Sequence, residues 1–463
     1  MSKNFSSMFY GCDLITNIKP LTNWNVLRCK DFTEMLRRCN ISDIKPLESW
    51  NVSNGTDFYG IFTGNLISDI TLLEKWDISN GKNLGALFFD CKNIIDITPI
   101  KNLNLSKCET LEYLFSNCEK LSDISPIKNW NISNIKDLHG LFSGCKNLSD
   151  ISPIKNWNVS NCEDFGVLFY ECEKIYDISP IKNWNVSNAK NLERMFFGLK
   201  NLSNITPIQN WNVSNCENFS SLFSGCEKLY DLSPLKNWNV SDAKNIESMF
   251  SDWKYLSDLT PIKNWDISKC ENISNLFYEC ENLININAIK YWNVSNVKNF
   301  SSMFYECSSL KDIKPLENWN VSNGKALNCM FAYCSFSDLT PLKNWNVSNV
   351  NDFSDMFNSC SMIKDLKPLE KWNVSNGTNF SLMFADLKLV IDISPLKNWN
   401  VANGKNFDMM FRGAVSLKNK NELKNWKFSK NTYFDSMFRD SSASASNNEY
   451  YGYYENDGGH ASC

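Results

Sequence analysis

Tryptophan recurs along this chain in a single register. Fifteen tryptophans, from Trp24 to Trp426, follow one another at intervals of 27 residues, or of 26 in three cases, once Leu103 is counted in the one gap. Only Trp253 lies outside this Trp column. Such a period is typical of a solenoid, in which each unit packs only against its neighbours and the array grows in one direction. The 463 residues therefore do not have to divide into several globular domains.

Other residues keep the same register. Phe occurs twelve residues after the Trp column in every unit but one, where Leu36 takes its place. Three residues further on is a position that is most often Cys, which we call the Cys column. All thirteen prolines lie four residues before the Trp column, from Pro20 to Pro395. Apolar, cysteine and proline positions that repeat together indicate that every unit has the same local structure.

The register divides the chain into one repeat array and a tail. We predict a single array of about sixteen units of 26–27 residues over residues 1–439. Residues 1–23 form a partial first unit, and residues 412–439 form a degenerate unit that caps the C-terminal end. Residues 440–463 have no apolar period, and we expect them to be disordered.

Within a unit, two apolar patterns follow each other. Residues 130–133 (Trp-Asn-Ile-Ser) alternate apolar and polar side chains, which is typical of a short strand. Leu138, Leu141, Phe142 and Cys145 then follow at the spacing of one face of an amphipathic helix. We therefore expect a short strand and a short helix in each unit.

An extended return is expected after the helix. Pro153 can neither continue a helix nor donate a ladder hydrogen bond, so it is predicted to turn the chain back toward the next strand. Successive strands are then parallel, and helices need more room between neighbours than strands do. The predicted fold class is an α/β solenoid, a right-handed coil with a parallel strand face on its concave side and short helices on its convex side. A mostly-β solenoid is the alternative.

The charge balance gives no signal for a nucleic-acid or membrane partner. Lys and Arg total 47 and Asp and Glu total 51, which leaves a net charge of −4 and a pI near 5.5. No stretch approaches the roughly 18 apolar residues that a membrane span needs. We therefore expect no nucleic-acid partner and no membrane span.

Histidine and cysteine usage argues against most catalytic and metal chemistry. The only histidines are His139 and His460, so neither a catalytic triad nor a histidine metal site is expected. The 18 cysteines contain no C-x-x-C pair, and eleven of them occupy the Cys column, where we expect buried, free thiols. The chain is predicted not to be an enzyme and to have no catalytic residue, cofactor or metal.

Two recurrent polar positions have competing explanations. Asp lies seven residues before the Trp column in most units, as in Asp150, and a stack of such carboxylates could bind calcium. We favour a structural role, in which each carboxylate accepts backbone N–H bonds in the return turn.

The Asn-x-Ser strings, such as residues 158–160, resemble glycosylation sites, but side chains in register at strand spacing leave no room for glycans. A ladder of Asn and Ser hydrogen bonds is the simpler explanation.

A second cysteine position recurs in every other unit. It lies five residues after the Trp column and holds Cys108, Cys162, Cys216 and Cys270. A small apolar residue such as Ala189 takes this position in a unit between them. We infer that the array grew by the copying of two-unit blocks.

The side chains that vary most from unit to unit lie on the expected helix. The outward strand positions are almost always Asn or Ser, which leaves little there to distinguish one partner from another. We therefore expect partner recognition on the helical face, with Arg37, Arg38, Tyr170 and Tyr333 as candidate partner-binding residues. A partly open sheet edge at the first unit also favours end-to-end self-association.

Two stretches carry a family resemblance. Residues 301–313 (SSMFYECSSLKDI) and 292–299 (WNVSNVKN) resemble the BspA-type leucine-rich repeat, and are especially similar to its 26-residue "Mycoplasma lipoprotein" class. The resemblance covers about residues 4–438. It implies a leucine-rich-repeat-like coil of the kind found in bacterial surface proteins and in some protists and large DNA viruses.

Together these features predict a non-enzymatic protein–protein interaction or scaffolding protein, whose protein partner the sequence does not name. A surface or virion structural or adhesion protein built from the same repeats is the alternative. Unlike the bacterial members, the sequence shows no signal peptide, no lipid-attachment cysteine near its start and no wall-anchoring tail. We therefore expect a cytoplasmic, intracellular protein of viral or bacterial origin, with the virion or cell surface as the alternative location.

Overall fold

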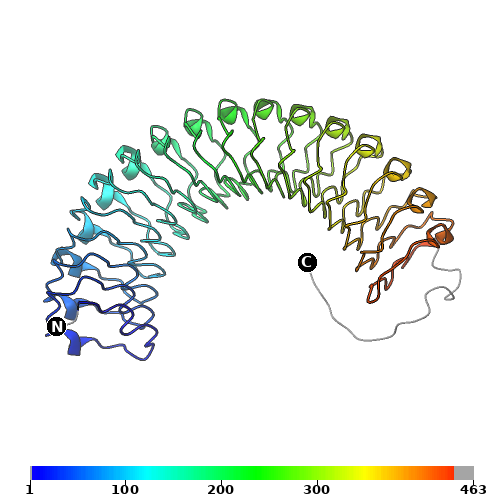
Figure 1. The fold of residues 1–463 in the computed structure, drawn as a ribbon. Coiled ribbons are helices and arrows are strands. Elements are labelled where there is room, and N and C mark those ends of the chain that lie inside the picture. Colours follow the sequence, from blue (N-terminus) through cyan, green and yellow to red (C-terminus); the bar gives the residue numbers. More distant parts are fainter. Residues whose placement is uncertain (1–2, 443–463) are drawn as a thin grey trace.

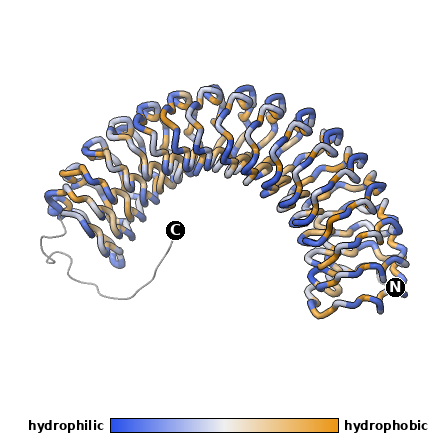
Figure 2. Tube along the Cα trace, turned by 180° about the vertical axis from the view of Figure 1, so that it is seen from behind, coloured by the Kyte–Doolittle hydropathy of each residue, from blue (hydrophilic) through white to orange (hydrophobic). Residues whose placement is uncertain are grey.

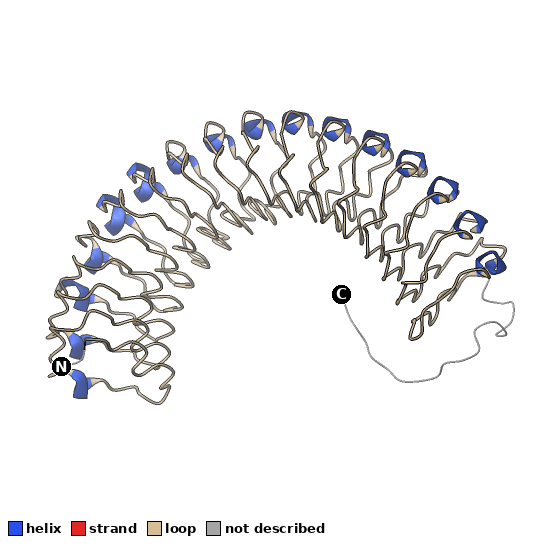
Figure 3. Cartoon of the chain, in the orientation of Figure 1, coloured by secondary structure: helices blue, strands red, loops and turns tan. Residues whose placement is uncertain are grey.

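Residues 3–442 form a curved array of coils. The computed structural model describes these residues, and one coil follows each repeat of the sequence (Figure 1). Every helix lies on the outer, convex rim of the arc, and the rest of each coil consists of loops and turns (Figure 3). The molecule is therefore a repeat solenoid, as the period predicts. Residues 443–463, most of the tail for which disorder is expected, lie outside the described residues.

The described coils contain short 3-10 helices and isolated parallel bridges. The helices are Lys19–Leu21 (η1), Lys45–Leu47 (η2), Thr71–Glu74 (η3), Thr98–Ile100 (η4), Ser125–Asn129 (η5), Ser152–Asn156 (η6), Ser179–Ile181 (η7), Thr206–Ile208 (η8), Ser233–Leu235 (η9), Thr260–Ile262 (η10), Asn287–Ile289 (η11), Lys314–Leu316 (η12), Thr340–Leu342 (η13), Lys367–Leu369 (η14), Ser394–Leu396 (η15) and Lys420–Leu423 (η16). Within residues 3–442 there is no α-helix, and the parallel pairing consists of isolated bridges instead of continuous strands. The predicted α/β class is therefore wrong in its helices.

Proline and aspartate together form the helical turn. In η6, Pro153 is the second residue, where its fixed φ suits a first helical turn. Oδ1 of Asp150 accepts the N–H of Ser152 at 2.7 Å, and the Ser152 hydroxyl donates to Oδ2 at 2.9 Å. The predicted structural role of the Asp column is confirmed. The extended return predicted at Pro153 is wrong, because the proline lies in a turn of helix.

The helix predicted at residues 138–145 is also wrong. These residues form successive turns in which the N–H of Leu141 donates to the carbonyl of Leu138 at 3.1 Å, and the N–H of Cys145 to that of Phe142 at 3.0 Å. Such bonds span three residues, whereas an α-helix has bonds that span four. The side chains expected on the inner face of the helix are nevertheless all buried.

Alternate N–H groups of the same segment link neighbouring coils. Those of Gly140 and Gly144 donate to the carbonyls of Gly166 and Tyr170 in the next coil, at 2.8 and 2.7 Å. One parallel bridge joins each pair of neighbouring coils at the seventh position after the Trp column. We call positions seven to fourteen after the Trp column the ladder segment. Its side chains that are not buried form the ladder face.

Left-handed residues prevent a helix in the ladder segment. Gly140 and Gly144 have φ of 62° and 69°, and Ser302 and Glu306 hold the same positions in another coil with φ of 53° and 54°. A right-handed helix cannot contain residues in that conformation. Two successive four-residue turns direct the same positions inward as a helix does, so apolar spacing alone does not distinguish them.

The apolar alternation predicted at residues 130–133 is present, but without strand pairing. The two apolar side chains are buried and the two polar ones are not. Side chains join the coils here: Trp130 Nε1 donates to the carbonyl of Ile100 at 2.9 Å, and Asn134 Nδ2 to the carbonyl of Ser106 at 2.7 Å. The ladder predicted for the Asn-x-Ser strings is wrong in its members: Asn131 Oδ1 accepts the N–H of Ser133 in its own coil at 3.1 Å, and the asparagine four residues after the Trp column links the coils instead.

The distance between coils explains why backbone groups join them in the ladder segment and side chains join them near the Trp column. The rings of Phe380 and Phe407, beside the first bridge of the ladder segment, have centroids 5.0 Å apart, whereas Trp372 and Trp399 of the same two coils are 6.5 Å apart. A backbone ladder needs neighbours about 4.8 Å apart. It therefore forms on the narrow, concave side, and side chains bridge the coils where these diverge. The expectation that the segment equivalent to residues 138–145 lies on the convex side is wrong: that segment is the concave ladder, and the helices on the convex rim come from the proline-containing segment.

One hydrophobic core runs through the coils from Phe5 to Phe438. Figure 2 shows hydrophobic stretches along the legs of the coils and hydrophilic loops at the outer rim. The Cys column, which holds buried, free thiols from Cys39 to Cys360 as predicted, is part of this core. Because each coil covers the apolar side of the next, stability depends on stacking and not on any single unit.

The Cys column supplies hydrogen-bond donors as well as apolar volume. Cys145 Sγ donates to the carbonyl of Phe115 in the preceding coil at 3.2 Å. Trp253 occupies this column and donates its Nε1 to Phe223 at 3.1 Å, the equivalent carbonyl of its own neighbour. The tryptophan outside the Trp column therefore replaces a cysteine and keeps its hydrogen bond.

Candidate functional site

The four residues proposed from the sequence lie on the ladder face and not on a helix. Arg37 and Tyr170 occupy the thirteenth position after the Trp column, and Arg38 and Tyr333 the fourteenth. All four are exposed or half-buried. Arg37 and Arg38 share one coil, but Tyr170 and Tyr333 belong to coils far from it and from each other, so the structure does not bring the four together into one patch.

Arg37 belongs to a small cluster that the chain completes by itself. Its guanidinium pairs with the carboxylate of Glu34 in the same coil. Its Cζ also lies 5.5 Å from the centroid of the Tyr10 ring in the preceding coil, a cation–π arrangement. The cation therefore has both a carboxylate and an aromatic face within the molecule.

The one histidine among residues 3–442 lies in a polar network on the ladder face. His139 Nδ1 lies 3.1 Å from Oδ1 of Asp164, and the ring packs edge-on against Tyr113 with centroids 4.9 Å apart. The Asp164 carboxylate also accepts the N–H of Gly166 at 2.7 Å and Nδ2 of Asn191 at 3.1 Å. We call these residues the histidine cluster. The sequence analysis placed His139 on a helix and missed this network.

The pKa values in the histidine cluster favour an ion pair. Burial lowers the pKa of His139, but the hydrogen bond to Asp164 and the charges of Asp164, Asp137 and Glu193 outweigh burial and raise it above 6.5. Burial raises the pKa of Asp164, but its hydrogen bonds, first that from His139, outweigh burial and lower it below 3.8. The pKa of Asp137 is raised, chiefly by burial. The chain thus compensates the charge of Asp164 internally.

A second cluster, which we call the tyrosine strip, lies further along the ladder face. It consists of Tyr278, Tyr305, Tyr333, Asp252, Glu279 and Glu306. The rings of Tyr278 and Tyr305 stack with centroids 4.7 Å apart and an angle of 4° between their planes. Tyr333 packs edge-on against Tyr305 at 5.4 Å. Only Tyr333 of this strip was predicted, although tyrosines in consecutive coils are visible in the sequence.

Two columns of alternating charge border the ladder segment. The sixth position after the Trp column holds Lys82, Glu109, Lys136, Glu163, Lys190, Glu217, Lys244, Glu271 and Lys298, which we call the first rail. The sixteenth position, the second rail, alternates in the same way from Lys92 to Glu281. Ion pairs between neighbouring coils span 2.5–3.7 Å along the first rail. The two-unit alternation inferred from the cysteines therefore also orders charge, which the sequence analysis missed.

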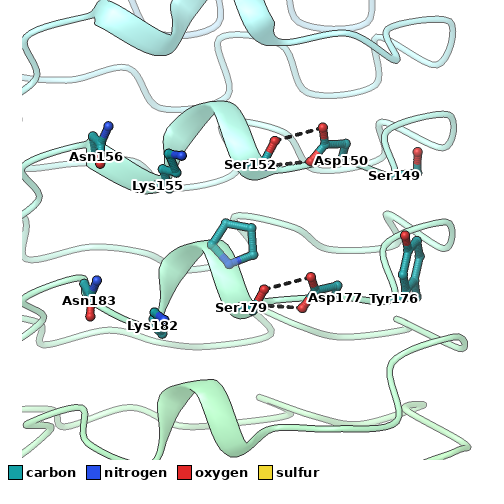
Figure 4. A pocket seen from close by; sticks show the side chains of 11 residues that line it. Ser149, Asp150, Ser152, Lys155, Asn156, Tyr176, Asp177, Ser179, Lys182 and Asn183 are labelled. Atoms are coloured by element: carbon teal, nitrogen blue, oxygen red, sulfur yellow. Dashed lines mark hydrogen bonds between the residues drawn. The ribbon is translucent and has the colours of Figure 1, made fainter.

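Shallow grooves separate neighbouring helices on the convex rim. One groove of about 410 Å³ lies between η6 and η7 and is lined by Asp150, Lys155 and Asp177, among others (Figure 4). Its two aspartates accept hydrogen bonds from Ser152 and Ser179. Similar grooves lie between other pairs of helices. They follow from the divergence of the coils on this side and do not single out one site.

The ladder face is the candidate functional site, because it gathers aromatic and charged side chains that differ from coil to coil. Within residues 3–442, no three His, Cys, Asp or Glu side chains come together in a way that could hold a metal ion. No described helix has the length and apolar character of a membrane span.

Several solved structures of repeat proteins resemble this chain. An internalin (InlF) from Listeria monocytogenes is 16% identical, with 89% of this chain and 82% of that chain covered and a TM-score of 0.28. A leucine-rich cell surface protein from Faecalibacterium prausnitzii is 13% identical, with 72% and 78% covered and a TM-score of 0.34. A leucine-rich-repeat protein from Bacteroides ovatus is 14% identical, with 74% and 77% covered and a TM-score of 0.28. With identities and TM-scores this low, the likenesses carry no inference about function.

A family model matches most of the sequence. A comparison with curated proteins finds no match to the chain. The family model described as "Mycoplasma protein of unknown function, DUF285" matches five overlapping stretches, which are residues 3–123, 89–204, 173–260, 253–366 and 334–451. The repeats that define the register are thus the repeats of this family, and the chain belongs to the Mycoplasma DUF285 family.

Proposed function

We propose that the chain is a non-enzymatic scaffold that binds a protein partner through its ladder face. One observation carries the proposal: positions nine, thirteen and fourteen after the Trp column differ from coil to coil, whereas the Asn and Ser positions beside the Trp column are almost constant. A fixed backbone that presents varied side chains along a concave surface suits protein recognition. The BspA-type resemblance of residues 301–313 supports the same proposal.

Affinity capture with the full chain as bait tests this function. We expect the combined substitution of Arg37, Arg38, Tyr170 and Tyr333 by alanine to weaken the capture of a protein partner identified by mass spectrometry. The physical reason is that these four side chains are exposed or half-buried on the ladder face, while the core beneath them stays intact.

A matched control uses the convex rim. Lys155, Lys182, Tyr176 and Tyr230 carry the same number of cationic and tyrosine side chains, and both tyrosines are exposed. Their replacement by alanine should leave the capture unchanged. Unchanged capture by the ladder-face variant, or an equal loss in both variants, would contradict the proposal.

We also propose that copies of the chain stack end to end. The ladder has a direction, because the N–H groups of one coil donate to the carbonyls of the next. Within residues 3–442, the carbonyls of Ser6, Met8 and Tyr10 accept no backbone hydrogen bond, and the N–H groups of Ser436 and Phe438 donate none. These two sets are complementary in register. Light scattering should show a mass that rises with concentration, and a strictly monomeric species would overturn this proposal.

The cytoplasm is the proposed location, with the virion or cell surface as the alternative. The buried free thiols of the Cys column support a reducing compartment. Cell fractionation with intact-mass analysis distinguishes the two locations. Glycans, lipid or disulfides on the isolated protein would favour the surface.

A further inference from the structure

Several carboxylates in or beside the ladder segment are paired with a cation of the same chain. Along the first rail Lys and Glu alternate from coil to coil, and pairs such as Lys190 and Glu163 lie 2.5 Å apart. At the N-terminal end Arg37 pairs with Glu34 and covers the ring of Tyr10. In both places the molecule supplies the cation that its own carboxylate needs.

Among the described residues, the carboxylates of the tyrosine strip have no such cation. Asp252, Glu279 and Glu306 hold the same position in three consecutive coils, and none of them forms an ion pair among residues 3–442. Lys254, the lysine whose charge reaches Glu279, is paired with Glu281 at 3.3 Å. Like charges in neighbouring coils repel one another. The repulsion among these carboxylates therefore lowers the stability of the stack slightly, and a cation from outside would relieve it.

Stacked aromatic rings lie beside these carboxylates. Tyr278 and Tyr305 are parallel at 4.7 Å, and Tyr333, which is 41% exposed, packs edge-on against Tyr305 at 5.4 Å. Burial, and then the charge of Glu279, raises the pKa of Tyr278 to about 12. The tyrosines therefore stay neutral, and both the ring faces and the carboxylates attract cations.

We propose that the tyrosine strip docks an extended segment of a protein partner that carries Lys or Arg side chains. The proposal rests on the scaffold function and specifies the chemistry of the partner. The chain itself shows the chemistry of such a contact, since the guanidinium of Arg37 pairs with the carboxylate of Glu34 and lies over the ring of Tyr10. An extended segment advances about 3.3 Å per residue and crosses three coils in roughly three to five residues.

Defined peptides test the charge of the occupant. Three fluorescein-labelled peptides, of alternating Arg and Ser, Glu and Ser, and Gln and Ser, are titrated with the full chain and followed by fluorescence anisotropy. The arginine peptide should bind, with an affinity that falls as salt rises, and the other two should not. Equal binding of the glutamine or glutamate peptide would overturn the proposal.

Charge-matched variants test the place of binding. The triple variant Asp252→Asn, Glu279→Gln, Glu306→Gln should weaken binding of the arginine peptide about tenfold, the combined effect expected for several exposed ion pairs. The control variant Glu163→Gln, Glu217→Gln, Glu271→Gln changes the net charge equally on the first rail and should stay within about twofold. Equal weakening in both variants would mean attraction by bulk charge only and would overturn the proposal.

Substitution of the Tyr305 ring and the melting temperature of the triple variant give two further tests. Tyr305→Phe keeps the ring and should bind as the wild type does, whereas Tyr305→Leu should bind about threefold more weakly. Because the three carboxylates repel one another, the strip variant should keep or raise the melting temperature. A lower melting temperature would show that these carboxylates serve the fold, and would overturn the proposal.

Failure of this inference is distinguishable from failure of the scaffold function. A protein captured by the wild type, lost on substitution of Arg37, Arg38, Tyr170 and Tyr333, and retained by the strip variant would overturn the inference while the scaffold function stands. Loss of the same protein from the strip variant, with displacement by the arginine peptide, supports the inference.

Discussion

The histidine cluster and the tyrosine strip lie on the same ladder face, yet they differ in how their charges are compensated. In the histidine cluster, Asp164 accepts hydrogen bonds from His139, Asn191 and the backbone. In the tyrosine strip, Glu279 and Glu306 follow each other in consecutive coils without an ion pair among residues 3–442. One backbone frame thus supports a cluster whose carboxylate pairs with a cationic side chain of the chain, and another with carboxylates that accept hydrogen bonds but have no ion pair in the described part of the chain.

This difference separates contributions to stability from contributions to binding. A compensated network stabilises the stack of coils, because removal of one member leaves a half-buried partner unpaired. An uncompensated row of like charges weakens the stack slightly, and a cationic partner relieves that repulsion. Substitutions in the two clusters should therefore change stability in opposite directions.

The largest effect is expected where the histidine cluster is most closely packed. Gly140 has φ of 62°, and a Cβ there would lie 2.4 Å from the ring of Tyr113, so Gly140→Ala forces that ring away from His139. We expect a loss of about 2–3 kcal/mol in the free energy of unfolding, measured by urea denaturation. Gly198→Ala is the control, because Gly198 is also left-handed but its Cβ would meet only an ordinary contact at 3.5 Å. Equal losses in both variants would show that backbone strain, and not the cluster, sets the cost.

Removal of the imidazole should produce a smaller, pH-dependent loss. The pKa of His139 is raised in the folded state, so its stabilisation is present in full below 6.5 and disappears as pH rises through the folded pKa. We expect His139→Gln to lose roughly 1 kcal/mol at about pH 6 and much less at about pH 8.5. Melting curves at the two pH values measure this. If the difference in melting temperature between the wild type and His139→Gln did not change with pH, His139 would not be charged in the cluster.

A reversal of charge on the first rail tests compensation outside the clusters. Glu217→Lys replaces the ion pair with Lys244 and places three lysines, with Lys190, in consecutive coils. The melting temperature should fall at low salt and recover at high salt, because screening removes repulsion between exposed charges. Glu227→Lys, at the equivalent place on the second rail, should have a smaller effect, since no ion pair of Glu227 occurs among residues 3–442. A loss that salt does not reverse would mean that packing, and not charge, is responsible.

The smallest effect, with the opposite sign, is expected in the tyrosine strip. Burial, and then the charge of Asp252, raises the pKa of Glu279, so this carboxylate weakens the fold progressively as pH rises through its folded pKa. Glu279→Gln should therefore stabilise the chain by a few tenths of a kcal/mol near neutral pH. The gain should vanish in acid, where Glu279 is protonated. If Glu279→Gln destabilised the chain at neutral pH, this carboxylate would stabilise the fold, as Asp164 does in the histidine cluster.

Much of the fold follows from the sequence because the period is independent of local conformation. The Trp, Phe, Cys and Pro registers predict the stacked coils, the buried columns and the role of Asp150 without knowledge of any backbone angle. The local assignments fail for a geometric reason. Turns with left-handed residues at Gly140 and Gly144 bury the same positions as a helix, and residues such as Ser302 adopt that conformation without any glycine to signal it.

The candidate site was predictable only in part. Variation from unit to unit correctly places Tyr170 and Tyr333 among the exposed or half-buried side chains of the segment, but it does not show which coils are close enough for rings to stack. The contacts of Tyr305 with Tyr278 and Tyr333 depend on the narrow spacing of the concave side, which appears only in three dimensions. The alternating charges of the two rails can be found in the sequence once the register is known.

The alternation of Lys and Glu along the first rail also limits how the number of coils encoded by the gene can change. Between Lys82 and Lys298, deletion of one coil would bring two lysines or two glutamates face to face on the first rail. Deletion or insertion of two coils restores the alternation and leaves the stack electrostatically unchanged. Recombination among these repeats should therefore yield viable descendants that differ by even numbers of coils, and the arc can lengthen or shorten in such steps without a new set of interfaces.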